Sequence, residues 1–198
     1  MVELLGPDRL RSVLLQEPPT ELIPGPRAAV ASIFRSGDEG TELLFIQRAA
    51  KNGDPWSGQM AFPGGRVDPR DAHSFATAER ETHEEVGLDL RPAERLGSLG
   101  ELDGGRANNR LVAVNAHAYW WYDLAPRLTP NHEVAQALWV PLAHLADRGR
   151  YIEYIYPATG MPFPGIQLDQ QHQVVWGLTL RFLSDLFRRI EVPFIIQD

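Results

Sequence analysis

Hydrophobic and polar residues follow two different periods along this chain, and these periods predict strands in some segments and helices in others. Apolar and β-branched residues dominate 27–34 and 42–47, and the polar turn residues 36–40 between them predict a β-hairpin. Residues 60–62 would form a short strand that Pro63-Gly64-Gly65 then breaks. We therefore expect a sheet to begin in the first third of the chain.

Alternating apolar residues return further along the chain. Strands are expected at 95–102 and 110–122, on either side of a turn at 103–109, and again at 135–140. Pro141 is placed to open a short helix that runs through Leu145. These segments would extend the sheet.

Helical spacing marks both ends of the chain. Residues 10–14 carry leucine and valine at spacings of three and four, which predicts a short helix over an edge of the core, ended by Pro18-Pro19. Apolar residues at every fourth position predict a final helix over 173–190. The aromatic, Pro- and Gly-rich segment 151–171 is expected to be a loop.

A further helix is predicted in the middle of the chain, over residues 74–86. Ser74 or Asp71 is placed to cap its start, and Gly87 is placed to stop it. Helices and strands then follow one another in groups and do not alternate regularly. This order predicts an α+β fold, in which a mixed β-sheet is sandwiched between helices.

The composition is that of one folded domain. The chain has 198 residues, and its 8 Phe, 5 Trp and 5 Tyr are too many large core formers for a disordered protein. A chain of this length fits one domain, and we expect that domain to span 1–198. Residues 1–26 would be an N-terminal helical extension and 173–190 the C-terminal helix.

The charge balance and the missing cysteines exclude several classes of function. A net charge of -7 argues against a general nucleic-acid partner, because such binding needs a basic surface. With no cysteine there can be no disulfide, thiolate nucleophile or cysteine-bound zinc. No apolar run is long enough for a membrane span and no secretory signal is recognisable, so we expect a cytoplasmic protein without a membrane partner.

The chemistry points to the acidic end of the central helix. Glu81, Glu84 and Glu85 are spaced i, i+3 and i+4, which places three carboxylates on one helix face. Like charges at this spacing repel, and a hard divalent cation such as Mg²⁺ or Mn²⁺ would offset the repulsion. The alternative is a solvated acidic face with Arg80 as a local partner.

The surrounding residues decide in favour of a metal site. The segment from Gly65 to Leu88 resembles the signature of the Nudix hydrolases, G-x5-E-x7-R-E-U-x-E-E-x-G-U, in which U is aliphatic. The matching residues are Gly65, Arg80, Glu81, Glu84, Glu85, Gly87 and Leu88. The chain departs from the signature at Asp71, which replaces its first glutamate, at Thr82, which replaces an aliphatic residue, and in having eight residues between Asp71 and Arg80.

Further motifs are similar to those of one subgroup, the coenzyme A pyrophosphatases. The similar segments are Arg48-Ala49, Ser57-Gly58-Gln59, Phe62-Pro63-Gly64-Gly65 and Val175-Trp176-Gly177-Leu178-Thr179. The chain has Ile46 where this subgroup usually has threonine, and Lys51-Asn52-Gly53-Asp54 where it usually has an arginine. The resemblance implies metal-dependent hydrolysis of coenzyme A or its derivatives to 3′,5′-ADP and 4′-phosphopantetheine.

Other functions stay open beside this one. ADP-ribose, dinucleoside polyphosphates and nucleotide sugars are alternative substrates of such a pyrophosphohydrolase. A noncatalytic nucleotide-binding module is a remote alternative, because such modules usually lose the metal carboxylates that this chain keeps. An isomerase of isoprenoid diphosphates is disfavoured, because its relatives use a cysteine.

The resemblance also implies roles for individual residues. Glu81 and Glu85 would be the leading metal ligands, with Glu84 as a further ligand or as the base that activates water. The carbonyl of Gly64 and the downstream Glu133 would complete the metal site.

Three arginines are expected to support this chemistry. Arg80 would hold Glu81 in position by a charge-assisted hydrogen bond. Arg48 and Arg66 would contact substrate phosphates, because a guanidinium can present two donors to adjacent oxygens. His83 is expected to be a surface residue without a role, residues 151–171 are expected to determine specificity, and likeness to the family implies a homodimer.

Overall fold

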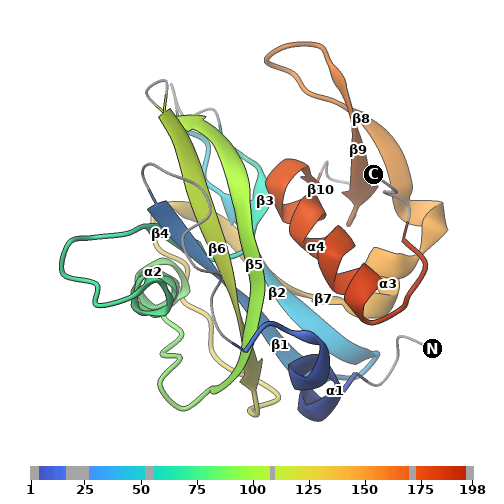
Figure 1. The fold of residues 1–198 in the computed structure, drawn as a ribbon. Helices are drawn as coiled ribbons and strands as arrows, with labels where there is room; N and C mark the ends of the chain where they lie inside the picture. The colour runs from blue at the N-terminus through green and yellow to red at the C-terminus, as the bar shows by residue number, and fades with distance from the viewer. Residues whose placement is uncertain (1–4, 17–26, 52–55, 108–109, 170–172, 195–198) are drawn as a thin grey trace.

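The computed structural model describes residues 5–16, 27–51, 56–107, 110–169 and 173–194. Figure 1 shows a central β-sheet with helix α2 on one face and helices α1, α3 and α4 on the other. The predicted α+β fold with a mixed sheet between helices is therefore confirmed. None of the described helices has the length and the apolar character needed to cross a membrane.

The central sheet contains both parallel and antiparallel pairs. Its strands are β1 Arg27–Gly37, β2 Gly40–Arg48, β3 Met60–Ala61, β4 Gly64–Arg66, β5 Glu94–Ala107, β6 Arg110–Trp121 and β7 Val134–Pro141. They are ordered β3-β2-β1-β6-β5, with β4 paired to β1 and β7 paired to β2. The pair β1 and β6 is parallel, whereas the other pairs are antiparallel.

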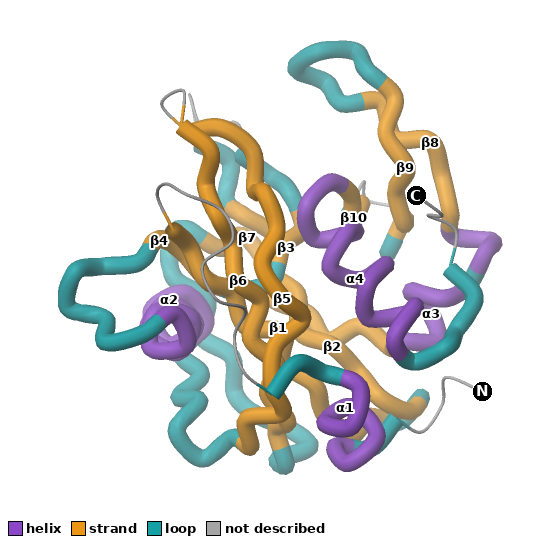
Figure 2. Tube along the Cα trace, viewed as in Figure 1, coloured by secondary structure: helices purple, strands orange, loops and turns teal. Residues whose placement is uncertain are grey.

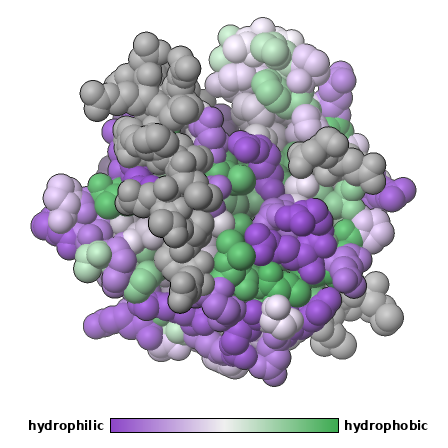
Figure 3. Space-filling view, viewed as in Figure 1, coloured by the Kyte–Doolittle hydropathy of each residue, from purple (hydrophilic) through white to green (hydrophobic). Residues whose placement is uncertain are grey.

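A second, smaller sheet carries a projecting hairpin. It has the order β10-β9-β8, and its strands are β8 Tyr151–Ile155, β9 Pro162–Gln167 and β10 Val174–Trp176. Figure 2 shows the connection between β8 and β9 extending away from the rest of the chain. Figure 3 shows pale and apolar side chains gathered at this projection, and Ile155 and Met161 there are 51% and 56% exposed.

The four helices in the described part of the chain cover the sheet because each buries apolar side chains. They are α1 Pro7–Val13, α2 Ser74–Val86, α3 Leu142–Ala146 and α4 Gly177–Arg189, and a 3₁₀ turn follows α3 at Arg148–Arg150. Neighbouring residues of β1 point to opposite faces, so that Ile33 belongs to the same hydrophobic cluster as Ala78 of α2, and Phe34 to the cluster that contains Phe182 of α4. The sheet thus has a hydrophobic core on each face.

Most predicted elements are present, with longer strands than expected. The hairpin of β1 and β2, the helix over 74–86 and the short helix after Pro141 are confirmed. Helix α1 ends at Val13, and the prolines expected to end it lie outside the described residues. Leu15 then pairs with Ser98 at the edge strand β5, as expected of a segment that covers an edge.

Two predictions in the C-terminal third were wrong. The described part of the segment, 151–169, is not all loop, because β8 and β9 form an antiparallel hairpin there. Its prolines are tolerated because Pro162 begins β9 and Pro164 lies beyond the end of β10, whose pairing starts at Gly165. The final helix begins at Gly177 and not at residue 173, because 174–176 are the strand β10.

Two local predictions also need correction, and a third is confirmed in part. The short strand β3 ends at Ala61, before Pro63, as expected, but Gly64–Arg66 then forms a strand of its own that pairs with β1. The turn expected at 103–109 is shorter, because the ladder of β5 and β6 continues to Ala107 and Arg110 through a register shift. The cap of α2 is neither Ser74 nor Asp71 but His73, whose Nδ1 accepts a hydrogen bond from the amide of Ala76 at 3.2 Å.

Candidate active site

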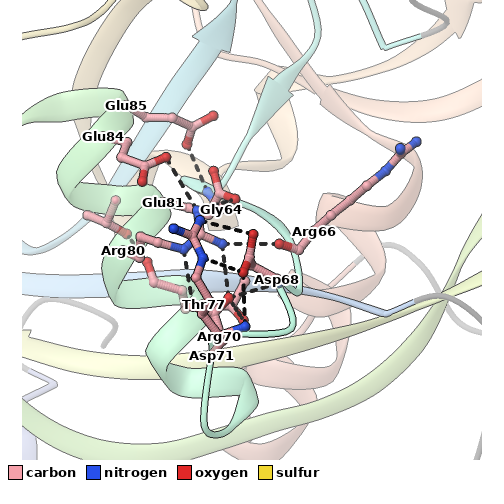
Figure 4. A network of polar contacts seen from close by, with 12 residues as sticks. Gly64, Arg66, Asp68, Arg70, Asp71, Thr77, Arg80, Glu81, Glu84 and Glu85 are labelled. Carbon is pink, nitrogen blue, oxygen red and sulfur yellow. Dashed lines mark hydrogen bonds and ion pairs between the residues drawn. The ribbon is translucent and has the colours of Figure 1, made fainter.

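Helix α2 presents its glutamates to the glycine strand β4 (Figure 4). The stripe that α2 packs against the sheet includes Ala78, Thr82 and Val86, and Glu85 lies on that stripe. The hydroxyl of Thr82, at a position where the signature has an aliphatic residue, donates to the carbonyl of Ala78 at 2.6 Å. This buried polar group is therefore satisfied.

Glu85 is the most buried of the three carboxylates. Its side chain accepts a hydrogen bond from the amide of Gly64 at 2.8 Å, and the residue is 2% exposed. The pKa of Glu85 is raised to about 7, mainly by burial and in addition by the charges of Glu81 and Glu133, whereas the Gly64 amide and Arg48 act in the opposite direction. Arg48, Glu81 and Glu133 therefore lie close enough for their charges to act on Glu85.

Both glycines of β4 are needed at their positions. A Cβ atom on Gly65 would lie 2.4 Å from the Cδ of Glu81, so only glycine lets this carboxylate approach the strand. Gly64 has φ of +153°, and a Cβ there would lie 2.3 Å from the carbonyl oxygen of Ala29. Burial raises the pKa of Glu81, whereas its hydrogen bond to Arg80 lowers it.

Arg80 joins the acidic residues into one network (Figure 4). Its Nη1 donates to Glu81 at 2.9 Å and to the exposed Glu84 at 3.3 Å. Its Nη2 donates to the carbonyl of Arg66 at 3.2 Å. The predicted contact between Arg80 and Glu81 is therefore present, and the carboxylates around Arg80 raise the pKa of its guanidinium.

Asp71 anchors this arginine from the loop before α2. Its carboxylate also accepts hydrogen bonds from the hydroxyl of Thr77 at 2.8 Å and from the amide of Asp68 at 3.0 Å. The Arg80 guanidinium holds the pKa of Asp71 well below its usual range. Sequence reasoning considered Asp71 only as a helix cap and as a departure from the signature, although its place at the first glutamate of the signature was a usable signal.

Residues 129–133 bring Glu133 to the same site. The amide of Thr129 donates to the carbonyl of Val86 at 2.8 Å, and the amide of Asn131 donates to the carbonyl of Glu85 at 2.9 Å. The carbonyl of Glu133 accepts from the amide of Ala49 at 2.8 Å. Asn131 is a second residue that sequence reasoning missed, and no pattern around it indicated this contact.

The two arginines predicted to bind phosphate lie differently. Arg48 is close enough to Glu85 for its charge to lower the pKa of that carboxyl, and its amide donates to the carbonyl of Gln59 at 3.0 Å. Arg66 is exposed, and its guanidinium points away from the carboxylates in Figure 4. His83 is exposed on α2, as expected.

The acidic residues fit a hard divalent cation by their chemistry. Among the described residues, no three acidic or histidine side chains already converge as a closed coordination shell. The atoms proposed to bind the metal are all oxygens, which Mg²⁺ and Mn²⁺ prefer as ligands. Glu133 raises the pKa values of both Glu81 and Glu85, and a cation would remove the repulsion that these shifts express.

Comparison with known families agrees with this arrangement. A family profile described as "NUDIX domain" matches residues 25–157. The chain belongs to the Nudix family. This Nudix hydrolase therefore acts on derivatives of nucleoside diphosphates by cleaving a phosphoric anhydride, and Nudix hydrolases generally use divalent metal ions.

Individual relatives support the same assignment. A Cronobacter sakazakii protein named uncharacterized Nudix hydrolase NudL is 31% identical over 192 residues, which are 95% of this chain and 90% of that protein. The uncharacterized protein C14C4.10c of Schizosaccharomyces pombe is 36% identical over 129 residues, which are 58% of this chain and 39% of that longer protein. Neither name specifies a substrate.

Solved structures show the same fold. A MutT/nudix family protein from Enterococcus faecalis has a TM-score of 0.56 and 19% identity, over 89% of this chain and 65% of that one. The NUDIX domain of Shewanella oneidensis NrtR, solved with ADP ribose, has a TM-score of 0.51 and 18% identity, over 88% of this chain and 94% of that one. At these identities the likeness extends to the fold alone.

Proposed function

We propose that this Nudix hydrolase cleaves coenzyme A or its derivatives to 3′,5′-ADP and 4′-phosphopantetheine, with Mg²⁺ or Mn²⁺ as the metal. The hydrolytic chemistry rests on one observation, the grouping of the α2 glutamates beside Gly64 and Gly65. The assignment of the substrate rests on the subgroup motifs, parts of which are close in space. Arg48 is bonded to Gln59 through its amide, and the amide of Lys51 donates to the hydroxyl of Ser57 at 2.9 Å.

The metal would be held by oxygens from three elements. Glu81, Glu84 and Glu85 of α2, the carbonyl of Gly64 and the carboxylate of Glu133 are the proposed ligands. When bound, the cation neutralises charge that develops on the phosphoryl oxygens and lowers the pKa of a bound water. A protein with net charge -7 needs this compensation to hold a diphosphate.

The residues of the chain would guide the attack of water. Water attacks one phosphorus of the diphosphate, and the bond from this phosphorus to the bridging oxygen breaks. Glu84 is the proposed base that takes the proton of the water, because its side chain is 55% exposed and can reach solvent. Arg80 keeps Glu84 and Glu81 in place during this transfer.

The two remaining arginines would contact different phosphates. Arg48, beside Glu85, lies where a diphosphate held at the metal would bind. Arg66, directed away from the carboxylates, would contact a phosphate further along the substrate (Figure 4). Coenzyme A carries such a phosphate at the 3′ position of its ribose, whereas ADP-ribose does not.

The second sheet offers a surface for the rest of the substrate. We define the aromatic face as the half-buried rings of Tyr154, Tyr156, Phe163 and Trp176. The ring centroid of Trp176 lies 5.1, 4.8 and 5.2 Å from those of the other three, in the same order. The opposite face of the sheet is packed into the core through Ile166 and Val175. The aromatic face therefore points away from the core.

This aromatic face is connected to the catalytic strand. Strand β10, which ends at Trp176, lies beside β3, and the hydroxyl of Thr179 donates to the carbonyl of Met60 at 3.4 Å. From Met60 the chain runs through β3 directly into Gly64. A long substrate with its diphosphate at Gly64 would reach the aromatic face, and stacking on aromatic rings suits an adenine.

A product assay tests the proposal directly. Purified protein with Mg²⁺ or Mn²⁺ is given coenzyme A, ADP-ribose, dinucleoside polyphosphates, NADH and nucleotide sugars, and products are identified by mass spectrometry. Preferential formation of 3′,5′-ADP and 4′-phosphopantetheine is expected. Preference for another diphosphate would reject coenzyme A but keep the hydrolase, and the NrtR complex makes ADP-ribose the second candidate.

Two variants test the substrate contacts. Trp176→Ala should raise KM for coenzyme A about 10-fold with little change in kcat, which is the scale of one lost stacking contact. Arg66→Ala should weaken the binding of coenzyme A more than the binding of dephospho-coenzyme A. Tyr122→Ala, which removes an aromatic ring that is 63% exposed elsewhere, is the matched control. The cytoplasmic location and the homodimer stay predictions.

A further inference from the structure

The C-terminal end of α2 is closed by residues from a distant segment. A helix leaves its last four carbonyls without partners in the helix itself, and here all four are bonded. The amide of Gly87 donates to the carbonyl of His83 at 3.0 Å, and the amide of Thr129 donates to the carbonyl of Val86 at 2.8 Å. The two carbonyls between them, of Glu84 and Glu85, accept from Asn131. The segment 129–133 is thus docked on the helix that carries the glutamates.

Asn131 makes its contacts with three acidic residues. Its side-chain Nδ2 donates to the carbonyl of Glu84 at 2.8 Å, and its amide donates to the carbonyl of Glu85 at 2.9 Å. Its Oδ1 accepts from the amide of Glu133 at 2.8 Å. One residue therefore links both helix glutamates to the glutamate of another segment.

Glu133 is held from its other side as well. Its carbonyl accepts from the amide of Ala49, the residue after Arg48. The Glu133 side chain is exposed. Its backbone is fixed on both sides, between Asn131, which is bonded to α2, and the residue that follows β2.

The side chain of Asn131 is not needed for docking alone. The backbone amides of Thr129 and Asn131 already hold the segment on the helix, and any residue provides such an amide. Only the two side-chain bonds depend on the asparagine, and they are the bonds that join Glu84 to Glu133. The specific contribution of this side chain is thus to the spacing of the two acidic groups.

We propose that Asn131 is a positioning residue of the hydrolase, which sets the distance between the α2 glutamates and Glu133 so that one divalent cation can bind both. It does not touch the reacting atoms, and it acts through Glu133. The inference rests on the proposed metal site, but it is independent of the identity of the substrate.

Direct binding of Mn²⁺ tests this role. The dissociation constant is measured by electron paramagnetic resonance without any nucleotide, for the wild type and for Asn131→Ala, Glu133→Gln and the double variant. Asn131→Ala should weaken Mn²⁺ binding at least about 10-fold, the scale known for residues that support metal ligands. The double variant should bind no more weakly than Glu133→Gln, because Asn131 acts through that residue.

A matched variant separates positioning from docking. Thr129→Ala changes the same segment but keeps the backbone bond to Val86, so it should bind Mn²⁺ like the wild type. If Asn131→Ala does not fold at the assay temperature, Asn131→Ser replaces it, because serine keeps an acceptor near the Glu133 amide and loses only the reach to Glu84. Its expected Mn²⁺ affinity lies between those of the wild type and Glu133→Gln.

Two results would overturn the proposal. One is wild-type Mn²⁺ affinity in Asn131→Ala or, where serine replaces alanine, in Asn131→Ser. The other is a double variant whose fold-loss of Mn²⁺ affinity equals the product of the fold-losses of the two single variants, because Asn131 would then act independently of Glu133. Since no nucleotide is present, a wrong assignment of coenzyme A would leave both measurements unchanged, whereas loss of all Mn²⁺ binding in the wild type would refute the metal site itself.

Discussion

Both carboxylate oxygens of Asp71 accept hydrogen bonds from the guanidinium of Arg80, Oδ1 from Nε at 3.2 Å and Oδ2 from Nη2 at 3.0 Å. The remaining nitrogen of the same planar group reaches Glu81 and Glu84. A bidentate pair fixes the orientation of a guanidinium better than a single bond does. Asp71 therefore determines which way Arg80 presents its donors to the glutamates.

Asp71→Asn should lower kcat about 10- to 100-fold at saturating metal, with little change in KM. The amide of asparagine keeps one acceptor and turns a donor toward Arg80, so the guanidinium loses its fixed orientation. Asp68→Asn is the control, because Asp68 pairs with the exposed Arg70 in the same loop. Equal kinetics in the two variants would contradict the role of Asp71.

Glu85→Gln should lower kcat at least about 10²-fold, the scale of losing one electrostatic stabiliser. Glutamine keeps the acceptor for the Gly64 amide but carries no charge, so the shape of the site is retained. Glu79→Gln, on the same helix but paired with Arg95 at 2.6 Å, should keep near-normal activity. Steady-state kinetics with Mg²⁺ measure both, and an active Glu85→Gln enzyme would refute the metal assignment.

The stability of the metal-free protein should depend on the protonation of Glu85. Its pKa is raised to about 7 from the ordinary value of 4.5, so between these values the folded state keeps a proton that the unfolded state loses. This residue therefore makes folding less favourable as pH rises through that window, by up to about 3 kcal/mol, and has no further effect above it. Bound metal would reverse the effect, because it needs the charged carboxylate.

The measurement compares wild type with Glu85→Gln by urea unfolding in a chelator. Glu85→Gln should be the more stable protein at pH 8 and equal to the wild type near pH 4.5. The wild type alone is not sufficient, because His117 also changes its protonation in this pH range. Burial lowers the pKa of His117 to about 4, which makes folding more favourable as pH rises from there to its ordinary value, and this contribution cancels between the two proteins. A constant difference across this range would show that Glu85 has an ordinary pKa.

Gly87→Ala should destabilise the protein for two separable reasons. Gly87 has φ of +72°, which costs a residue with a Cβ about 1–2 kcal/mol, and the new Cβ would lie 2.0 Å from the hydroxyl oxygen of Thr129. Combining it with Thr129→Ala removes the collision and leaves the backbone cost. The double variant should therefore be more stable than Gly87→Ala, as measured by thermal unfolding, and equal stability would exclude the collision.

Local patterns predicted the parts of this fold that depend on local interactions. The hairpin of β1 and β2 was recognisable because its alternation and its turn residues are adjacent in the chain, and the start and end of α2 had helical composition and a terminal glycine. The sheet of β8, β9 and β10 was missed because its strands are rich in Pro, Gly and aromatic residues and lack a clear alternation. These strands are stabilised by pairing with one another, which is a tertiary interaction that the local sequence pattern does not report.

The same distinction applies to the site. Glu81, Glu84 and Glu85 could be grouped because they share one helix face, and the family signature connected them with Gly65. Asn131 bonds to a carbonyl 47 positions earlier, and no periodicity reports such a contact. The direction of the Arg66 side chain likewise follows from the register of β4 on β1, which the glycine-rich sequence concealed.

The glycine pair at Gly64 and Gly65 belongs to a hydrogen-bonded strand of the central sheet. A strand paired in this way separates from its neighbour only when the sheet opens, so this wall of the site shares the cooperative unfolding unit of the core. The catalytic surface is then preorganised before any ligand arrives. Heating should abolish activity together with the unfolding of the sheet, without an earlier local melting of the site.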